Sequence, residues 1–197
     1  GKSTLLHCLA GLDRPTSGQI FLKEDDISTL NDKQLTKIRR DSFGFVFQAF
    51  NLIPTLTAEE NITLPASIAG RKPDMDWVTK VVKTVDIGDR LTHRPNELSG
   101  GQQQRVAAAR AMATKPEVIF ADEPSGNLDS KSSKELLSFM KSVVDELNQT
   151  IIMVTHDPYA ASYANRVIML KDGRIASDLD QPTQEEIVAE VTALTNI

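Results

Sequence analysis

Residues 98–105 read Leu-Ser-Gly-Gly-Gln-Gln-Gln-Arg, and this stretch decides how the rest of the chain is interpreted. Ser99 is a residue type that caps helix N-termini, and the run up to Ala113 favours a helix. Gly100 and Gly101 permit close approach of a backbone or a ligand. A helix start that presents free N–H groups and a hydroxyl suits an anion. These residues alone leave open a plain capped helix that follows a glycine turn.

A second phosphate site is predicted at residues 1–4, which read Gly-Lys-Ser-Thr. They match the second half of the phosphate-loop pattern G-x-x-x-x-G-K-[ST]. In that reading, backbone N–H groups from Gly1 to Thr4 hold phosphate oxygens, Lys2 reaches the β and γ phosphates, and Ser3 ligates Mg²⁺. A chance tetrapeptide at a helix start is the alternative. One nucleotide does not need two phosphate-binding sites in one subunit. The two motifs together therefore predict a dimer in which each subunit completes the nucleotide site of the other.

Two carboxylates follow an apolar strand predicted over residues 118–121. A buried strand places the residues after its end in a site at the sheet edge. Asp122 is therefore a candidate for the Mg²⁺ shell, and Glu123 for orienting or deprotonating an attacking water. A solvated acidic turn before Pro124 is the alternative.

Composition limits the function classes. The chain has 197 residues and a formal net charge of −5, which argues against a general nucleic-acid binder. Its one cysteine, Cys8, cannot form an internal disulfide, which fits a reducing compartment. No apolar run approaches the roughly 18 residues that span a bilayer.

Strands and helices alternate along the chain, which predicts an α/β fold with a largely parallel sheet covered on both faces. The expected strands cover residues 18–23, 43–47, 118–121 and 151–154, with a hairpin at residues 166–177 turning at Asp172-Gly173. The expected helices include residues 4–10, 32–40, 77–85, 98–113 and an amphipathic stripe over residues 136–147. Capping boxes at Thr57–Glu60 and Thr183–Glu186 mark two further helix starts.

Leu98 to Gln102 resembles the LSGGQ motif of ATP-binding cassette (ABC) ATPases. The order of the other motifs is also similar to that family, from Lys2 through Gln48, the LSGGQ stretch, Asp122-Glu123, Gly126-Asn127-Leu128-Asp129 and His156. The resemblance identifies Gly1–Thr4 as the second half of a Walker A motif, so the sequence is expected to be truncated at its start and to bind ATP poorly as it stands.

The resemblance implies a P-loop NTPase of the RecA-like type. One ABC ATPase domain over residues 1–197 would comprise an α/β core with an incomplete antiparallel β subdomain at 1–48 and 114–180. A helical subdomain would cover 49–113, and a helical tail 181–197.

Further residue roles come from the same resemblance. Gln48 resembles the glutamine that senses Mg²⁺ and the γ-phosphate near the membrane partner, although it could be an ordinary strand-end glutamine. Asp129 resembles an aspartate that communicates across the dimer, although it could simply cap the next helix. His156 resembles the histidine that contacts the γ-phosphate. His7 and His93 receive no role.

Two loops indicate a branch of the family. Residues 47–57 and 125–129 resemble the ATPases of lipoprotein release, macrolide export and antimicrobial-peptide export. The implied function is an ATPase that binds ATP and Mg²⁺ as a homodimer and drives a separate membrane permease of the export or mechanotransmission type, from the cytoplasmic face of the membrane. A regulatory relative, such as the permease partner in cell division, is the alternative. Lys23-Glu24-Asp25 departs from the family, which usually has a glycine there.

Overall fold

Three parallel strands form the central sheet. The structure, a computed structural model, describes residues 1–47, 50–126 and 128–195. The strands β3 (Phe43–Phe47), β4 (Val118–Asp122) and β5 (Thr150–Val154) pair in the order β3-β4-β5. The register matches Phe43 with Val118 and Val118 with Thr150, so all three strands start and end together. The predicted parallel sheet is therefore confirmed, because the apolar runs of these strands suit burial on both faces.

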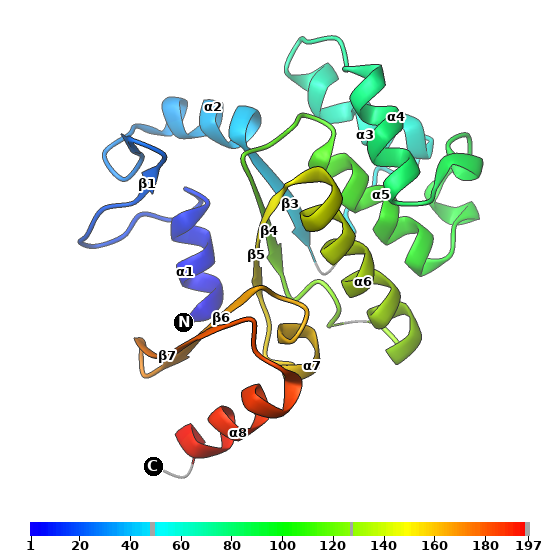
Figure 1. Ribbon diagram of the computed structural model, residues 1–197. Helices are drawn as coiled ribbons and strands as arrows, with labels where there is room; N and C mark the ends of the chain where they lie inside the picture. Colours follow the sequence, from blue (N-terminus) through cyan, green and yellow to red (C-terminus); the bar gives the residue numbers. More distant parts are fainter. Residues whose placement is uncertain (48–49, 127, 196–197) are drawn as a thin grey trace.

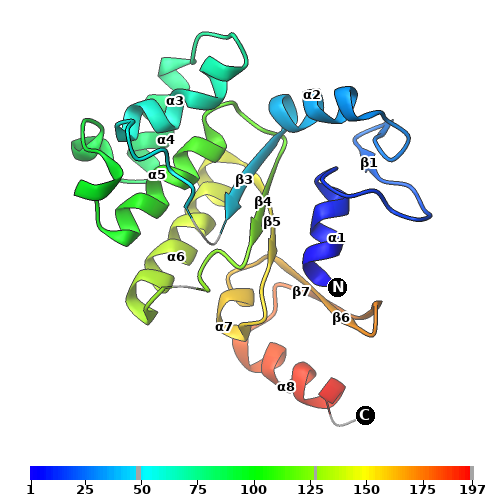
Figure 2. The same ribbon diagram turned by 180° about the vertical axis from the view of Figure 1, so that it is seen from behind.

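Helices cover both faces of this sheet (Figures 1 and 2). The helices α1 (Lys2–Leu9) and α2 (Asp32–Ser42) lie on one side, where Leu6 and Leu35 share an apolar cluster with Phe43 and Phe120. On the other side lie α5 (Gly100–Met112) and α6 (Ser130–Leu147), whose buried faces join a second and larger cluster. The stripe predicted on α6 is buried there at Leu136, Met140 and Val143.

A group of helices connects β3 to β4. It contains α3 (Ala58–Ile68), α4 (Met75–Thr84), the short 3-10 turns Gly88–Arg90 and Pro95–Glu97, and then α5. Thr57 caps α3 by the predicted box: its hydroxyl accepts from the Glu60 N–H, and Glu60 Oε2 accepts from the Thr57 N–H. Trp77 anchors α4 to the end of α5, because its indole Nε1 donates to the Met112 carbonyl over 2.8 Å.

Two antiparallel hairpins flank the core. The strand expected over residues 18–23 is shorter in the structure: only β1 (Phe21–Leu22) pairs with β2 (Asp25–Asp26). Gly18, with φ of +93°, is not extended, and the chain already turns at Lys23, with φ of 57°. Lys23 thus holds a left-handed conformation at the place where the family usually has a glycine.

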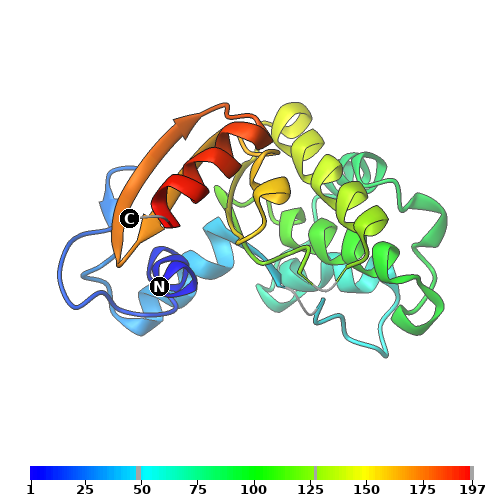
Figure 3. The same cartoon turned by 90° about the horizontal axis from the view of Figure 1, so that it is seen from below.

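The second hairpin follows the prediction. The strands β6 (Arg166–Lys171) and β7 (Arg174–Asp180) turn at Asp172 and Gly173, which both have positive φ. The short helix α7 (Pro158–Ala161) precedes this hairpin, and α8 (Gln184–Thr195) lies along it (Figure 3). None of the helices in the described ranges has the length and apolar character that a bilayer crossing requires.

At Gly44, β3 lies very close to the backbone of α5. A Cβ at this position would lie 2.3 Å from the Ala111 carbonyl oxygen and 3.2 Å from Ile119 Cγ1. Because the first neighbour is helix backbone, it cannot move aside without shifting α5.

We therefore expect Gly44→Ala to lower the free energy of unfolding by about 1–3 kcal/mol through overpacking. The urea midpoint measures this effect. Gly101→Ala serves as the matched control, because nothing lies within 4 Å of its Cβ, and it should unfold at the same or slightly higher urea. If Gly44→Ala unfolded at the same urea concentration as the wild type, the close packing of Gly44 against α5 would be contradicted.

Candidate functional site

The carboxyl ends of the three sheet strands meet at one edge. Asp122, the last residue of β4, is in register with Phe47 of β3 and with Val154 of β5. The residues that follow these strand ends, Glu123 and His156 among those described, therefore emerge side by side. This arrangement is where open α/β sheets place their ligands.

The start of α1 lies against Asp122. The Ser3 hydroxyl donates to Asp122 Oδ1 over 3.1 Å, although the residues are 119 positions apart. Gly1 is the N-cap of α1 and makes no side-chain cap bond, while Lys2 and Thr4 are exposed. The helix start thus presents N–H groups next to a hydroxyl and a carboxylate, which are the hard oxygen ligands that suit Mg²⁺.

Glu123 and His156 contact each other. His156 Nδ1 lies 2.8 Å from Glu123 Oε1, and the Glu123 N–H donates to the Val154 carbonyl over 2.9 Å. Glu123 has a φ of 47°, which is the left-handed region that residues other than glycine rarely occupy. Strain of this kind persists only when the surroundings hold the residue in place. The carboxylate is therefore fixed by its backbone, by its neighbouring strand and by the imidazole.

A cavity of about 820 Å³ opens beside this pair. Its lining includes Glu123, His156, Ser125, Leu128 and Tyr159. The cavity joins the turn after β4 to the turn after β5.

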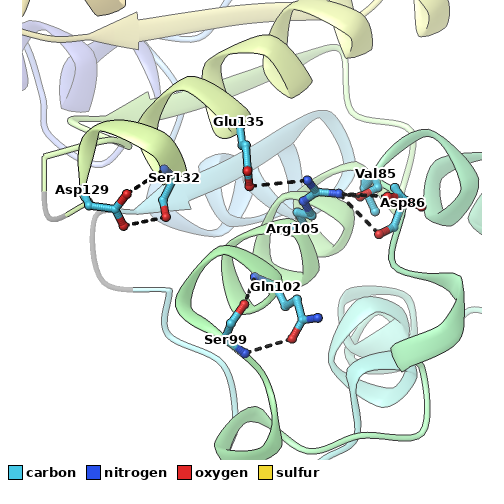
Figure 4. A network of polar contacts seen from close by, with 8 residues as sticks. All are labelled: Val85, Asp86, Ser99, Gln102, Arg105, Asp129, Ser132 and Glu135. Atoms are coloured by element: carbon cyan, nitrogen blue, oxygen red, sulfur yellow. Dashed lines mark hydrogen bonds and ion pairs between the residues drawn. The ribbon is translucent and has the colours of Figure 1, made fainter.

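The predicted LSGGQ helix start has a complete capping box (Figure 4). The Ser99 hydroxyl accepts from the Gln102 N–H over 3.3 Å, and Gln102 Oε1 accepts from the Ser99 N–H over 2.9 Å. Because the hydroxyl acts as acceptor in this bond, its own proton remains available to a second acceptor. Beyond the adjoining backbone, a Cβ at Gly100 or Gly101 would meet no atom within 4 Å. The fold of one chain therefore does not require glycine at these positions.

Asp129 caps α6, which is the simpler of the two interpretations that the sequence allowed. Its Oδ1 accepts from the N–H groups of Lys131 and Ser132, and its Oδ2 accepts from the Ser132 hydroxyl over 2.7 Å (Figure 4). The hydrogen bonds from the Ser132 N–H and hydroxyl hold the pKa of Asp129 below its ordinary value. Its expected role across the dimer stays a prediction.

Two of the predicted motif residues, Gln48 and Asn127, lie outside the described residues. Ala49 lies outside them as well, so the nearest described residues are Phe47 and Phe50 around the first position and Gly126 and Leu128 around the second.

Two residues of this region escaped the sequence reasoning. Gln104 is buried on α5, and its Nε2 donates to the Pro124 carbonyl over 2.7 Å, which ties the LSGGQ helix to the turn that contains Glu123. His7 Nε2 lies 3.8 Å from Asp122 Oδ2. His7 carries a sequence signal, because it follows Ser3 by one helical turn. Gln104 carries none, because it stands among other polar residues at the start of its helix.

The N-termini of α1 and α5, the two predicted phosphate-binding helix starts, do not face each other within one chain. The helix α1 packs on one side of the sheet, and α5 packs on the other (Figures 1 and 2). The LSGGQ residues Ser99, Gly100, Gly101 and Gln102 therefore belong to a different surface from Lys2 and Ser3.

A sequence profile described as ABC transporter matches residues 1–126. The chain belongs to the ABC transporter family. The predicted α/β P-loop cassette and the predicted family are thereby confirmed.

Relatives of this ABC transporter chain include an ATP-binding protein of a lipoprotein-releasing system and one of bacitracin export. The lipoprotein-releasing system ATP-binding protein LolD 1 of Chlorobium chlorochromatii is 42% identical over 199 residues, which cover 100% of this chain and 81% of the relative. The bacitracin export ATP-binding protein BceA of Halalkalibacterium halodurans is 45% identical, over 91% of this chain and 72% of the relative. Both names fall within the branch that the loops predicted.

A solved structure with the same fold is the ATP-binding cassette MJ0796 of Methanocaldococcus jannaschii, in a dimeric post-hydrolysis state bound to ADP and Pi. It superposes with a TM-score of 0.76 at 41% identity, over 92% of this chain and 81% of that chain.

Proposed function

We propose that this protein is the ATP-hydrolysing subunit of an ABC transporter, and that two copies close head to tail over two ATP molecules. The observation that carries the proposal is the separation of the two helix starts by the central sheet (Figure 1). Lys2 and Ser3 of one copy would meet Ser99 and the glycines of the other. The dimeric state of MJ0796 with ADP and Pi supports a dimer that holds nucleotide.

The proposed site divides phosphate binding between the two copies. Gly1 to Thr4 and Lys2 bind the phosphates at the start of α1. The Ser99 hydroxyl of the second copy donates to the same phosphates, while Gly100 and Gly101 leave room for them and Gln102 holds Ser99. Asp129 fixes the start of α6 at the dimer surface.

Ser3 and Asp122 would hold Mg²⁺, with Gln48 as a further ligand. Their 3.1 Å contact supports this, because a hydroxyl and a carboxylate already converge there. When bound, the ion neutralises charge on the phosphate oxygens.

Glu123 orients the attacking water and accepts its proton, in a position that supports the role of a general base. His156 holds the carboxylate through the 2.8 Å contact and reaches toward the γ-phosphate. Gln48 senses the γ-phosphate. The presence or loss of that phosphate is then communicated to the permease.

The partners of the transport complex are proposed from the relatives. LolD 1 is named for a lipoprotein-releasing system and BceA for bacitracin export. We therefore propose a separate permease of the export or mechanotransmission type, and a location at the cytoplasmic face of the membrane. Within the cassette we propose the division into a core at 1–48 and 114–180, a helical subdomain at 49–113 and a tail at 181–197.

Mixed dimers of the full-length protein test the head-to-tail site. One dimer carries Lys2→Ala and Gly101→Asp in the same copy, and the other carries them in different copies. With shared sites, the first dimer has two damaged sites and the second keeps one intact.

We therefore expect about one occluded molecule of a non-hydrolysable ATP analogue per dimer when the changes are split, and almost none when they are together. Rapid gel filtration measures the occluded nucleotide. If each copy instead formed its own complete site, the two results would be exchanged, and the proposal would fail.

A further inference from the structure

The turn that carries Glu123 is bonded to α5 through a proline carbonyl. Gln104 of α5 donates from Nε2 to the Pro124 carbonyl oxygen over 2.7 Å, across 20 positions of the chain. Gln104 is only 1% exposed, and Pro124 is fully buried. A buried amide lowers stability unless it finds a hydrogen-bond partner, so this bond is a defined part of the fold.

The chemistry of Pro124 makes this bond important for its position. Proline has no backbone N–H, so another segment can hold its backbone by a hydrogen bond only through the carbonyl oxygen. The residue before it, Glu123, donates its N–H to the Val154 carbonyl over 2.9 Å, and its own carbonyl accepts from the Gly126 N–H over 3.0 Å. The turn is thus bonded to β5 through Glu123 and to α5 through Pro124.

The backbone of Glu123 needs support of this kind. Its φ of 47° lies in the left-handed region, which raises the free energy of a residue that has a side chain. A proline at the next position restricts Glu123 further, toward extended backbone. Both preferences favour relaxation of the turn, and a bond that fixes Pro124 opposes it. The direction of the Glu123 carboxylate, which lies 2.8 Å from His156 Nδ1, depends on this conformation.

The helix α5 is a firm support for the bond. Gln104 lies in its second turn, and the residues that soon follow, Val106 and Ala107, are buried. The helix packs against β3 and against α3. A side chain on such a rigid element can hold a neighbouring turn closely enough to orient a reacting group.

We propose that Gln104 is a positioning residue for ATP hydrolysis, which fixes the Pro124 peptide and thereby holds the Glu123 carboxylate toward the attacking water. The inference rests on the proposed function, which assigns the general base to Glu123. It adds a buried residue of the LSGGQ helix that orients the base without touching the substrate.

Gln104→Met in the full-length protein tests the inference, because methionine keeps the length of the side chain but has no N–H to donate. We expect kcat for ATP to fall about tenfold to a hundredfold, as for a small misplacement of a catalytic group, with little change in the KM. Dimerisation with a non-hydrolysable ATP analogue should match that of the wild type, because Ser99 and Gly101 are unchanged. Gln104→Asn, which moves the amide back by one methylene, is a second variant with the same expected direction.

Gln149→Met is the matched control. Gln149 is also buried, and its Nε2 donates to the Pro116 carbonyl over 2.8 Å, before the start of β4, whereas Pro124 follows the end of that strand. Gln104→Met and Gln149→Met each remove the donor to a buried proline carbonyl, so both should lower the thermal midpoint. Well below both midpoints, Gln149→Met should keep the wild-type kcat, because its bond does not reach the Glu123 turn.

A double-mutant cycle with Glu123→Gln separates positioning of the base from other effects. If Gln104 acts through Glu123, adding Gln104→Met to Glu123→Gln should not slow turnover further. A loss that multiplies with that of Glu123→Gln would overturn the inference.

The outcomes distinguish this inference from the proposed function. Wild-type kcat for Gln104→Met, in a protein that loses turnover on Glu123→Gln, would overturn the inference alone. An equal loss of kcat in Gln104→Met and Gln149→Met would do the same. Wild-type turnover of Glu123→Gln would instead contradict the general base of the proposed function, and with it the inference that depends on it.

Discussion

Glu123→Gln should lower ATP turnover of the full-length protein about 100- to 1000-fold, because an amide cannot accept the proton of the attacking water. The substitution preserves the size of the side chain and an oxygen that can face His156 Nδ1, which lies 2.8 Å away in the native pair. The backbone strain at φ of 47° is the same for both residues. Folding and nucleotide binding should therefore survive.

We further propose that the closed dimer reopens only when hydrolysis removes the γ-phosphate contacts. The Glu123→Gln protein should therefore accumulate as an ATP-bound dimer. Light scattering after gel filtration measures the dimer, and phosphate release measures turnover. Glu117→Gln is the control, because Glu117 directly precedes the same strand and pairs at the surface with Lys23. Turnover of Glu123→Gln within about twofold of wild type would remove the general-base assignment.

The second large effect is expected at Gly101. Beyond the adjoining backbone of its own helix, the Cβ of an aspartate there would meet no atom within 4 Å. In the first turn of α5 it replaces a poor helix former and places a negative charge at the positive end of the helix dipole, so the thermal midpoint should stay level or rise. The same charge would face the phosphates of the nucleotide that the second copy holds.

Like charges brought together at an interface oppose association by several kcal/mol. ATP-dependent dimerisation of Gly101→Asp should thus weaken by at least about a hundredfold, and turnover should fall with it. Analytical ultracentrifugation with and without ATP measures the association.

Gly88→Asp is the matched control for Gly101→Asp. It adds the same charge at another helix start, where the nearest atom to a built Cβ, Val82 Cγ1, lies 3.8 Å away. If Gly101→Asp dimerised at the same ATP concentration as the wild type, the shared site would be contradicted.

The sequence predicted the sheet well, because buried parallel strands leave a simple apolar signal. The expected strand over residues 43–47 matches β3, and those over 118–121 and 151–154 differ from β4 and β5 by one residue at one end. The strand expected over residues 18–23 was too long, since alternation of residue types does not reveal a backbone turn at Lys23.

Motif order predicted that Ser3, Asp122, Glu123 and His156 share one site, and the structure places Ser3 against Asp122 and Glu123 against His156. Their roles in the reaction stay predictions. What escaped prediction are contacts made between distant segments. Gln104 reads as an ordinary polar position of an amphipathic helix, and only the folded chain shows which carbonyl it meets.

The helix α5 has a mechanical consequence. About 16 Å of continuous helix, at 1.5 Å per residue, separates the cap at Ser99 from Arg110 near the other end. Its middle is packed against the sheet and against α3, with Val106 and Ala109 fully buried, so it has little freedom to bend. If contact with a neighbouring subunit displaced the Ser99 end of α5, the rigid helix would therefore displace its opposite end as well.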